Sequence, residues 1–529
     1  MKKYKALKKI RVMISLIFLT LLLLFFLDFA GIFPTDFIRG VIYLQFVPAL
    51  LKFFNVFSWI ATGFIVVLIL TLLFGRVYCS TICPLGILQD VVSFIRKKIH
   101  KKKKHRYLKA MRWLRYGILV VTVAFLAGGS ILILALFDPY SIFGRIVSDL
   151  FRPALTEGNN LLAGLLNKMD IYALYQVDLQ PIHAGVIAIP IAFLVLVVWM
   201  SFTKGRLYCN TVCPVGTFLG LLSKVSLYQI RLNPTSCTKC GICERKCKGG
   251  CIETKSQQVD FSRCVGCFNC LEACPFDSAE YALNPLYSSS HKTKAQPEKV
   301  ASHKTDVNKR KLLAGIAVAF FGATRMGKAQ KELVSYSATT PVKRDNPVSP
   351  PGAQSTERFN SSCTACHLCV NVCPTHVLQP ALLEYGLRGL MQPRMDYHSG
   401  FCNYDCVECS EVCPTGAILP VMLKDKKRVQ LGKVQFVKEN CIVETEGTDC
   451  GSCSEHCPTK AVDMVDYKNG LRIPEVNTDI CIGCGACEYA CPTKPYKAIY
   501  VEGNPVHLQA QKPKQEKLEE LDEEEDFPF

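Results

Sequence analysis

Residues 205–216 read GRLYCNTVCPVG and follow directly on an apolar run. Cys209 and Cys213 stand four positions apart, and a proline follows the second thiol. Residues four apart on a helix share one face, so the two thiols are expected side by side. The same motif occurs upstream as GRVYCSTICPLG, around Cys79 and Cys83. This repetition indicates two similar helical hairpins that end in the same thiol pair.

Three roles are open to the thiol pairs. Two pairs at one membrane depth can meet across a pseudo-two-fold axis, and they then bind a metal or cluster, cycle between dithiol and disulfide, or simply pack. Arg76 and Arg206 recur with the motifs, and they either anchor the topology or contact a thiolate or a quinone headgroup. The candidate redox or metal-binding thiols are Cys79, Cys83, Cys209 and Cys213.

Long apolar segments flank the motifs and predict four transmembrane helices. These segments are residues 12–27, 56–74, 116–137 and 184–202. A shorter apolar segment, 41–51, is expected to be interfacial or re-entrant. Basic residues concentrate at the N-terminus and between residues 96 and 115, which places both thiol motifs on the cytoplasmic side. The net charge of +18 therefore reflects topology next to a lipid membrane, and no nucleic-acid partner is expected.

Most of the 29 cysteines lie after residue 200 in regular groups. Such regularity favours metal ligation over a disulfide scaffold. C-x2-C-x2-C-x3-C-P is the bacterial ferredoxin signature, in which three close thiolates hold one cubane and the fourth cysteine reaches the partner cluster. A zinc site needs only C-x2-C pairs. Zinc binding therefore does not explain groups of four cysteines that end in C-P.

Two such groups lie in residues 233–285. We expect one 4Fe–4S cluster on Cys237, Cys240, Cys243 and Cys274. We expect a second on Cys247, Cys264, Cys267 and Cys270. Lys248 stands where the signature has proline, and the surplus Cys251 is an alternative to Cys247 as a ligand.

Four more groups follow in residues 357–508, which brings the expected total to six 4Fe–4S clusters. Their ligands are Cys363, Cys366, Cys369 and Cys373; Cys402, Cys406, Cys409 and Cys413; Cys441, Cys450, Cys453 and Cys457; and Cys481, Cys484, Cys487 and Cys491. The groups pair either as neighbours or as first with fourth and second with third. CTACH at 363–367 has the form of a haem-attachment motif, but haem would break the first group, so none is expected.

The linker 286–356 contains an apolar segment, 312–324, preceded by Lys309-Arg310-Lys311. This pattern resembles a twin-arginine export signal, and the alternative is a buried helix. Asp138 and His183 flank predicted spans and form a candidate proton-accepting pair for a quinol, or are simply interfacial. The acidic tail, 509–529, is expected to be solvated.

The expected fold is thus an all-α membrane domain with four transmembrane helices, residues 1–232, joined to α+β ferredoxin-like modules that bind 4Fe–4S clusters. Residues 1–285 resemble the NapH-type membrane quinol dehydrogenase ferredoxins, through the predicted spans, the two GRxYCxxxCP motifs and the double-cubane region. Residues 305–508 resemble the NapG/MauM-type exported ferredoxins. The imperfect twin arginine, Lys248 and the fusion itself depart from these families.

The resemblance implies an electron-transfer protein of the bacterial inner membrane, at most a quinol dehydrogenase component, with a periplasmic C-terminal module. Electrons would pass from the quinone pool to a periplasmic reductase or its electron carrier, as in nitrate reductase systems. The alternative is an accessory or maturation factor that sends reducing equivalents from a cytoplasmic donor to a periplasmic metalloenzyme.

Overall fold

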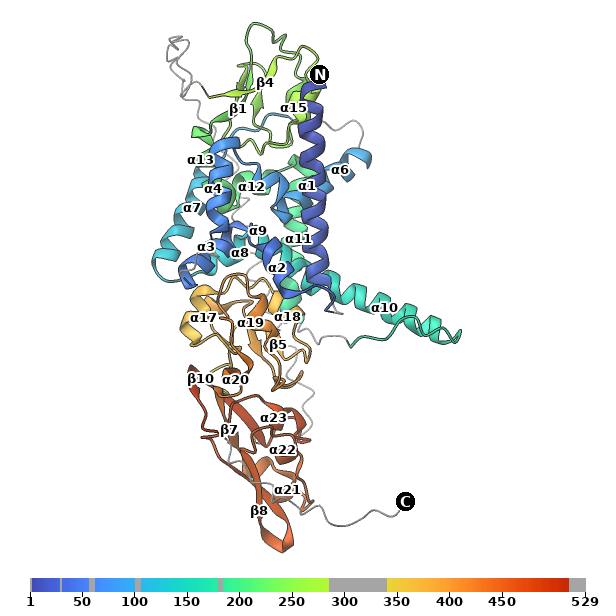
Figure 1. Cartoon of the computed structure of the whole chain (residues 1–529), viewed down its shortest axis with the longest axis vertical. Coiled ribbons are helices and arrows are strands. Elements are labelled where there is room, and N and C mark those ends of the chain that lie inside the picture. Colours follow the sequence, from blue (N-terminus) through green and yellow to red (C-terminus); the bar gives the residue numbers. More distant parts are fainter. Residues whose placement is uncertain are drawn as a thin grey trace, which may run out of the picture.

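The computed structural model describes residues 2–28, 31–56, 62–99, 106–178, 184–284 and 340–512. A helical domain occupies the middle of an elongated molecule (Figure 1). The module that contains β1 and β4 lies at the end that carries the N-terminus, beside the start of α1, and residues 340–512 extend from the opposite end. The twin-arginine-like segment, His183 and residues 513–529 fall outside the described residues.

Within the residues that the structure describes, two helices are long and apolar enough to cross a membrane: α1 (Lys2–Leu27) and α11 (Ala184–Lys204). The prediction of four such helices is therefore wrong. The second predicted span contains α4 (Gly63–Phe74), which ends at Gly75 with φ +76°. The third is divided at Gly128-Gly129 into α7 (Arg112–Ala127) and α8 (Leu132–Phe137). A glycine in the left-handed region ends a helix irrespective of hydropathy.

The segment expected to be interfacial or re-entrant falls in a bent helix pair. α2 (Thr35–Ile42) and α3 (Phe46–Val56) meet at 108° and form a third span only if the pair is counted as one. After α8, α9 (Pro139–Ile146) continues through a π-helical turn into α10 (Arg152–Asn167), which projects from the body (Figure 1).

Each thiol motif spans a break between two helices. In the first, α5 (Tyr78–Thr81) is followed by α6 (Pro84–Ile99). In the second, α12 (Leu207–Thr211) is followed by α13 (Pro214–Leu222). Proline cannot continue a helix but suits its first turn, so each motif proline begins a new helix. The two thiols of a motif therefore do not share one continuous helical face, contrary to the prediction.

The first soluble module, residues 228–284, is built from short elements. β1 (Tyr228–Leu232) pairs antiparallel with β4 (Ala279–Leu283), with Tyr228 opposite Leu283. The other elements are β2 (Ile252–Glu253), β3 (Gln258–Val259), α14 (Ile242–Lys246) and α15 (Asn269–Ala273). Its core consists of six cysteines and seven apolar side chains.

The second soluble module has two halves. The first contains α17 (Thr356–Ser362), α18 (Leu368–Asn371), β5 (Leu378–Pro380), β6 (Pro393–Met395), α19 (Glu408–Val412) and α20 (Leu423–Lys426). The second contains β7 (Val429–Phe436), α21 (Ile442–Thr445), α22 (Ser452–Glu455), β8 (Val462–Asp466), β9 (Arg472–Val476), α23 (Ala486–Ala490) and β10 (Ile499–Gln509). The antiparallel pairs are β5 with β6, β7 with β10, and β8 with β9.

Candidate cluster and thiol sites

Two cavities in the first soluble module are lined by cysteines in the predicted groups. One is lined by Cys237, Cys240, Cys243 and Cys274, which we call site 1. The other is lined by Cys247, Cys264, Cys267 and Cys270, which we call site 2, and also by Cys251. Each cavity thus receives its fourth cysteine from the other sequence group, as the ferredoxin signature predicts.

The surplus Cys251 lies against the second cavity without displacing Cys247. The two Sγ atoms are 3.5 Å apart. The hydrogen bond from the Cys251 thiol lowers the pKa of Cys247 to about 7, which favours its thiolate. A thiolate is the form that binds a metal. The signature spacing predicts Cys247 as the ligand, and Cys251, which lines the same cavity, lies close enough to donate to its sulfur.

In the second module, neighbouring cysteine groups come together. One cavity is lined by Cys457, Cys481, Cys484 and Cys487 (site 5). Another is lined by Cys441, Cys450, Cys453 and Cys491 (site 6). In the first half, Cys413 is near Cys363, Cys366 and Cys369 (site 3). Cys373 is near Cys402, Cys406 and Cys409 (site 4). The structure does not bring together the first group with the fourth.

The regular cysteine runs share a backbone conformation. In C-x2-C-x2-C, the residues on either side of the second cysteine have positive φ, whatever their type. The pairs are Lys239 and Gly241, Gly266 and Phe268, Ala365 and His367, and Gly483 and Gly485. A non-glycine residue in this region costs about 1–2 kcal/mol, so a tight wrapping of the chain is imposed even where no glycine relieves it. The two runs with longer first gaps do not show this pattern.

The two thiol motifs meet inside the helical domain. Their cysteines form what we call the four-thiol site: Cys79, Cys83, Cys209 and Cys213, each only 2–3% exposed. Cys83 lies within electrostatic range of the other three thiols. Arg76 donates to the carbonyl oxygen of Cys209 (3.1 Å), and Arg206 donates to that of Cys79. This reciprocal exchange relates the two motifs by approximate two-fold symmetry.

Arg76 and Arg206 are fully buried, so neither anchors the protein at a lipid surface. Arg206 Nε pairs with an Asp90 carboxylate oxygen at 2.8 Å. Lys248 pairs with the same oxygen at 3.3 Å, and Arg11 with the other. The lysine in the position of the signature proline therefore joins site 2 to α6, a function that its sequence context did not predict.

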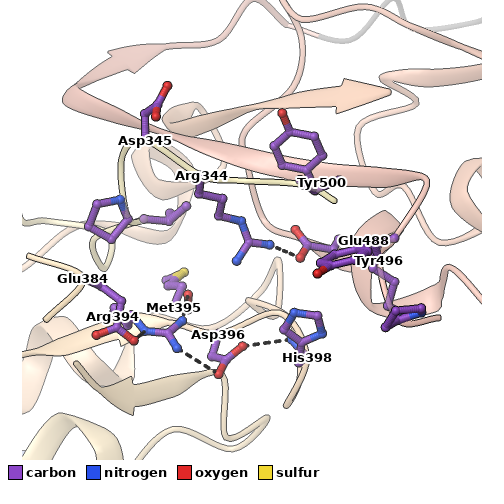
Figure 2. Close-up of a pocket in the computed structure, with 15 residues that line it drawn as sticks. Arg344, Asp345, Glu384, Arg394, Met395, Asp396, His398, Glu488, Tyr496 and Tyr500 are labelled. Carbon is purple, nitrogen blue, oxygen red and sulfur yellow. Dashed lines mark hydrogen bonds and ion pairs between the residues drawn. The ribbon is translucent and has the colours of Figure 1, made fainter. Parts of the chain in front are cut away.

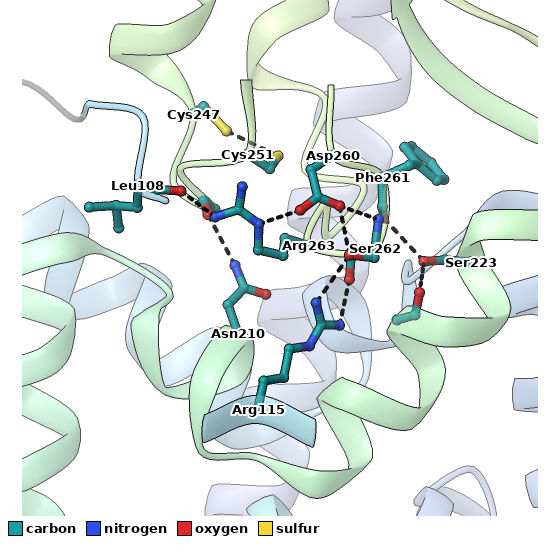
Figure 3. A network of polar contacts seen from close by, with 12 residues as sticks. Leu108, Arg115, Asn210, Ser223, Cys247, Cys251, Asp260, Phe261, Ser262 and Arg263 are labelled. Carbon is teal, nitrogen blue, oxygen red and sulfur yellow. Dashed lines mark hydrogen bonds and ion pairs between the residues drawn. The ribbon is translucent and has the colours of Figure 1, made fainter. Parts of the chain in front are cut away.

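The first soluble module docks on the thiol-motif helices through a polar network (Figure 3). Arg115 donates to the Ser262 carbonyl oxygen (2.8 Å) and hydroxyl (3.0 Å), and Arg76 also donates to that carbonyl (3.0 Å). Asn210, inside the second motif, donates to the carbonyl of Gly249 at 3.0 Å. Cys267 of site 2 belongs to the same apolar cluster as the four thiols. Site 2 and the four-thiol site are therefore neighbours.

The second soluble module docks on the opposite end of the helical domain. The buried His367 pairs through Nδ1 with Asp149 (2.8 Å) and through Nε2 with the carbonyl oxygen of Met391 (2.8 Å). Asn371 donates to the carbonyl oxygen of Phe26 at 3.0 Å. The histidine of the CTACH sequence is thus a docking residue. These contacts place the first half of the module against the π-helical turn after α9 and the end of α1, and the backbone oxygen of Cys366 in site 3 lies against Gly144 of α9.

The acid proposed for quinol chemistry has a structural partner. Asp138 caps α9, and its carboxylate accepts hydrogen bonds from the Ser141 amide (2.9 Å) and hydroxyl (2.7 Å). Such caps stabilise helix N-termini by about 1 kcal/mol. Its suggested partner His183 is outside the described residues, so the pair remains a prediction.

A polar cavity separates the two halves of the second module (Figure 2). Arg344 pairs with Glu488 across it, and Arg394 pairs with Glu384 (2.9 Å) and Asp396 (3.2 Å). These ion pairs are structural links, and the cavity is lined by none of the cysteines. In the described parts of the chain, no three His, Cys, Asp or Glu side chains converge as closely as a single metal ion requires.

Several segments match known iron–sulfur domain families. Residues 56–102 and 186–233 match one described as a 4Fe-4S binding domain, and residues 264–278 match another with that description. Residues 362–418 and 448–494 match families described as 4Fe-4S dicluster domains. No solved structure gives a significant match.

Whole-chain comparison finds distant relatives. An uncharacterised protein of Methanocaldococcus jannaschii is 25% identical over 53% of this chain and 97% of its own length. The putative electron transport protein YccM of Escherichia coli is 25% identical over 40% of this chain and 52% of its own length. The ferredoxin-type protein NapH of Escherichia coli is 24% identical over 44% and 70%. These similarities, with the domain matches, support an iron–sulfur electron-transfer protein that has several 4Fe-4S domains and is associated with a membrane.

Proposed function

We propose that this protein conducts electrons across the cytoplasmic membrane along a row of 4Fe–4S clusters held at sites 1 to 6. The observation that carries this proposal is the serial order of the cysteine sites. Sites 1 and 2 share the first module, the four-thiol site follows in the helical domain, and sites 3 and 4 adjoin its other end. Cys402 of site 4 donates its amide to the carbonyl oxygen of Cys484 of site 5 at 2.9 Å, which continues the row into the second half.

The row follows the long axis of the molecule (Figure 1). α1 and α11 run through the middle segment, and the basic N-terminus is at the end that carries sites 1 and 2. By the positive-inside rule, this end faces the cytoplasm. Sites 3 to 6 would then lie on the periplasmic side, which requires the predicted export of residues 357–508.

The chain contributes burial, hydrogen bonds and spacing. A bound 4Fe–4S cluster supplies one-electron redox chemistry, and its potential depends on solvent exposure and on hydrogen bonds to sulfur. Backbone amides donate to the predicted ligand sulfurs Cys363 (3.4 Å, from Ala365) and Cys457 (3.2 Å, from Ala461). Most of the cysteines in the six sites are buried. These features stabilise anionic clusters and exclude water from them.

The donor is proposed to act at site 1. Cys240 of this site is exposed, which gives a soluble cytoplasmic donor access to the first cluster. If quinol were the donor near the outer surface, sites 1 and 2 would lie off the path to a periplasmic acceptor. Their position in line with the four-thiol site therefore favours the delivery of reducing equivalents from the cytoplasm to a redox partner or metalloenzyme outside.

Proteoliposomes test this function. The full protein is reconstituted so that site 1 faces outward, cytochrome c is enclosed, and reduced ferredoxin is added outside. Reduction of the enclosed cytochrome is expected only in vesicles that contain the protein. Reduction of the protein clusters without reduction of cytochrome would contradict transmembrane transfer. Menaquinol is the second arm: if it reduces the clusters and ferredoxin does not, quinol is the donor.

Reporter fusions test the topology independently. A reporter placed after residue 284 and one placed after residue 512 are expected in opposite compartments. If both report the cytoplasm, all six sites lie on one side and the proposed route across the membrane is wrong.

A further inference from the structure

The row of six sites is interrupted by the helical domain, and the four-thiol site lies in this interval. We propose that Cys79, Cys83, Cys209 and Cys213 together ligate a seventh iron–sulfur cluster, which relays electrons between sites 2 and 3. The relay role of this cluster rests on the proposed function, whereas its ligand set follows from the contacts within the four-thiol site.

The first argument is the hydrogen bonding of the thiols. The Gln89 side-chain amide donates to Cys209 Sγ at 3.0 Å, and the Gly216 backbone amide donates to Cys213 Sγ at 3.2 Å. Bonds of this kind are also made to the predicted cluster ligands Cys363 and Cys481, at 3.4 and 3.3 Å. N–H donors aimed at sulfur stabilise thiolates and reduced clusters.

The second argument is charge. Arg76 is fully buried, and the hydrogen bonds of its guanidinium to oxygen all go to neutral groups, on Asn210, Ser262 and Cys209. Its Nη2 lies 3.9 Å from Cys79 Sγ. An isolated buried cation is strongly unfavourable unless an anion compensates it. Thiolates that ligate an iron–sulfur cluster would provide that anion, whereas neutral thiols or a disulfide would not.

The same excess of positive charge extends around Asp90. This one carboxylate pairs with three cations, Arg206, Lys248 and Arg11. Arg206 Nη2 and the Gln89 carbonyl oxygen are buried without a hydrogen-bond partner. Arg206 also lies in electrostatic range of both Cys209 and Cys267. The unbalanced charge is thus located between the four-thiol site and site 2, where two anionic clusters would compensate it.

The third argument is connection to site 3. Tyr208 lies in electrostatic range of Cys209, Cys213 and Asp138, and its hydroxyl donates to the Phe137 carbonyl oxygen at 2.9 Å. Tyr140 lies in range of Asp138 and of Cys366 in site 3. Tyr208 belongs to the apolar cluster of the four thiols, and Tyr140 belongs to the cluster that contains Cys366, so side chains of the helical domain reach from the four-thiol site to site 3.

The relay step is balanced. The cluster at site 2 is oxidised by one electron as the cluster at the four-thiol site is reduced by one. The latter then returns to its oxidised form as site 3 accepts the electron. No bond is formed or broken in the chain, and no proton transfer is required. Binding of the cluster would replace each of the four S–H bonds by an iron–sulfur bond, with four protons released to solvent.

Iron and acid-labile sulfide analysis of the full protein, purified without oxygen, tests the site. Six cubanes contain about 24 iron atoms per chain, and a seventh cluster brings this to about 26 or 28 for a binuclear or cubane form. The double variant Cys79→Ala/Cys209→Ala is expected to return the count to about 24 and to lose one EPR signal. Thr81→Ala/Thr211→Ala is the matched control, because these hydroxyls bond only to their own helix backbone.

Folding failure is separated from loss of the cluster by the remaining signals. If the cysteine variant retains the spectra of sites 1 to 6, a lower iron count identifies the ligands. If it does not fold, Mössbauer quantification of the wild-type protein still decides between six and seven clusters. Six clusters in the wild type, or a disulfide among the four cysteines after alkylation and mass spectrometry, would overturn the inference.

The outcomes for the inference and for the proposed function are distinct. A wild type with six clusters that still reduces enclosed cytochrome c supports transmembrane transfer without this relay. If the wild type holds seven clusters but never reduces the enclosed cytochrome c, the seventh cluster is supported and the proposed transmembrane transfer is contradicted.

Discussion

Single residues that depart from the expected motifs have identifiable roles in this protein. Lys248 replaces a proline and instead pairs with Asp90 on the helical domain. His367 completes a haem-like sequence and instead pairs with Asp149. Both form ion-pair or hydrogen-bond contacts between a soluble module and the helical domain. Departures from a ligand signature therefore coincide with the surfaces at which the modules dock.

Cys251 provides a test of how a non-ligand thiol adjusts a cluster. Removing its hydrogen bond to Cys247 is expected to destabilise the reduced cluster by about 1 kcal/mol, which lowers the potential of site 2 by roughly 40 mV. Redox titration of Cys251→Ala, followed by EPR, measures this shift, and the iron count should not change. Loss of a whole cluster would instead make Cys251 a ligand, with Cys247→Ala then expected to retain full iron.

His507 predicts a pH dependence of stability in the second module. Burial lowers the pKa of His507 to about 4, and its Nε2 bonds to the Ser349 hydroxyl at 2.9 Å. Below the unfolded pKa of about 6.5, the unfolded chain binds a proton that the folded chain excludes, so stability falls as the pH falls toward 4. The expected loss between pH 7 and 5 is about 2 kcal/mol.

Urea unfolding of the cluster-loaded protein at both pH values measures this loss. His507→Gln retains a polar side chain but cannot titrate. Between pH 7 and 5, its free energy of unfolding should therefore fall by about 2 kcal/mol less than that of the wild type. An unchanged decrease in this variant would show that other groups cause the pH dependence.

Among the helices, the broken segments carry the close contacts. A Cβ atom at Gly86 in α6 would lie 2.3 Å from the Cys79 carbonyl oxygen, and one at Gly216 in α13 would lie 2.4 Å from that of Cys209. The glycines after each C-P therefore allow the motif helices to fold back on their own cysteines. This local geometry is the same in both halves, as expected for a repeated unit.

The contact between α9 and the second module predicts a position-specific effect of alanine. A Cβ atom at Gly144 would lie 2.4 Å from the backbone oxygen of Cys366, so Gly144→Ala must displace one of the two. We expect a loss of about 1–3 kcal/mol from this overpacking, despite the better helix propensity of alanine. The thermal midpoint for loss of cluster absorbance in detergent should fall accordingly.

Gly158 in the exposed α10 is the control for this substitution. A Cβ atom there meets nothing within 4 Å, so Gly158→Ala should stabilise the helix by up to about 1 kcal/mol. A similar effect of both substitutions would contradict the close contact between α9 and site 3.

Over the whole molecule, the serial order of sites predicts where electrons stop. The double variant Cys366→Ala/Cys413→Ala removes two ligands of site 3, one from each sequence group. Addition of reduced ferredoxin should then reduce sites 1 and 2 while sites 5 and 6 remain oxidised. Rapid-freeze EPR of the wild type and the variant distinguishes these populations.

The matched control is Cys441→Ala/Cys491→Ala at site 6, the end of the row. This variant should leave sites 1 to 5 reducible and abolish only transfer to the outer acceptor. If site 5 is still reduced at the wild-type rate in the site 3 variant, the clusters do not act in series.

The sequence alone identified the cysteine groups and the two longest apolar helices. A cubane takes three thiolates from one short run, so its spacing is a local property of the chain. Hydropathy is likewise a sum over consecutive residues, which is why α1 and α11 were predictable. The division of the third predicted span into α7 and α8 was not, because Gly128 and Gly129 interrupt a run that hydropathy treats as continuous.

Only the tertiary structure decided how these local units are arranged. Three features join segments that are distant in the sequence. They are the pairing of cysteine groups in the second module, the meeting of the two thiol motifs, and the contacts of Lys248 and His367. Asp90 and Lys248, for example, are brought together by the packing of a soluble module on α6. Spacing specifies which residues can hold a cluster, whereas the order of the clusters depends on how the modules pack against the helical domain.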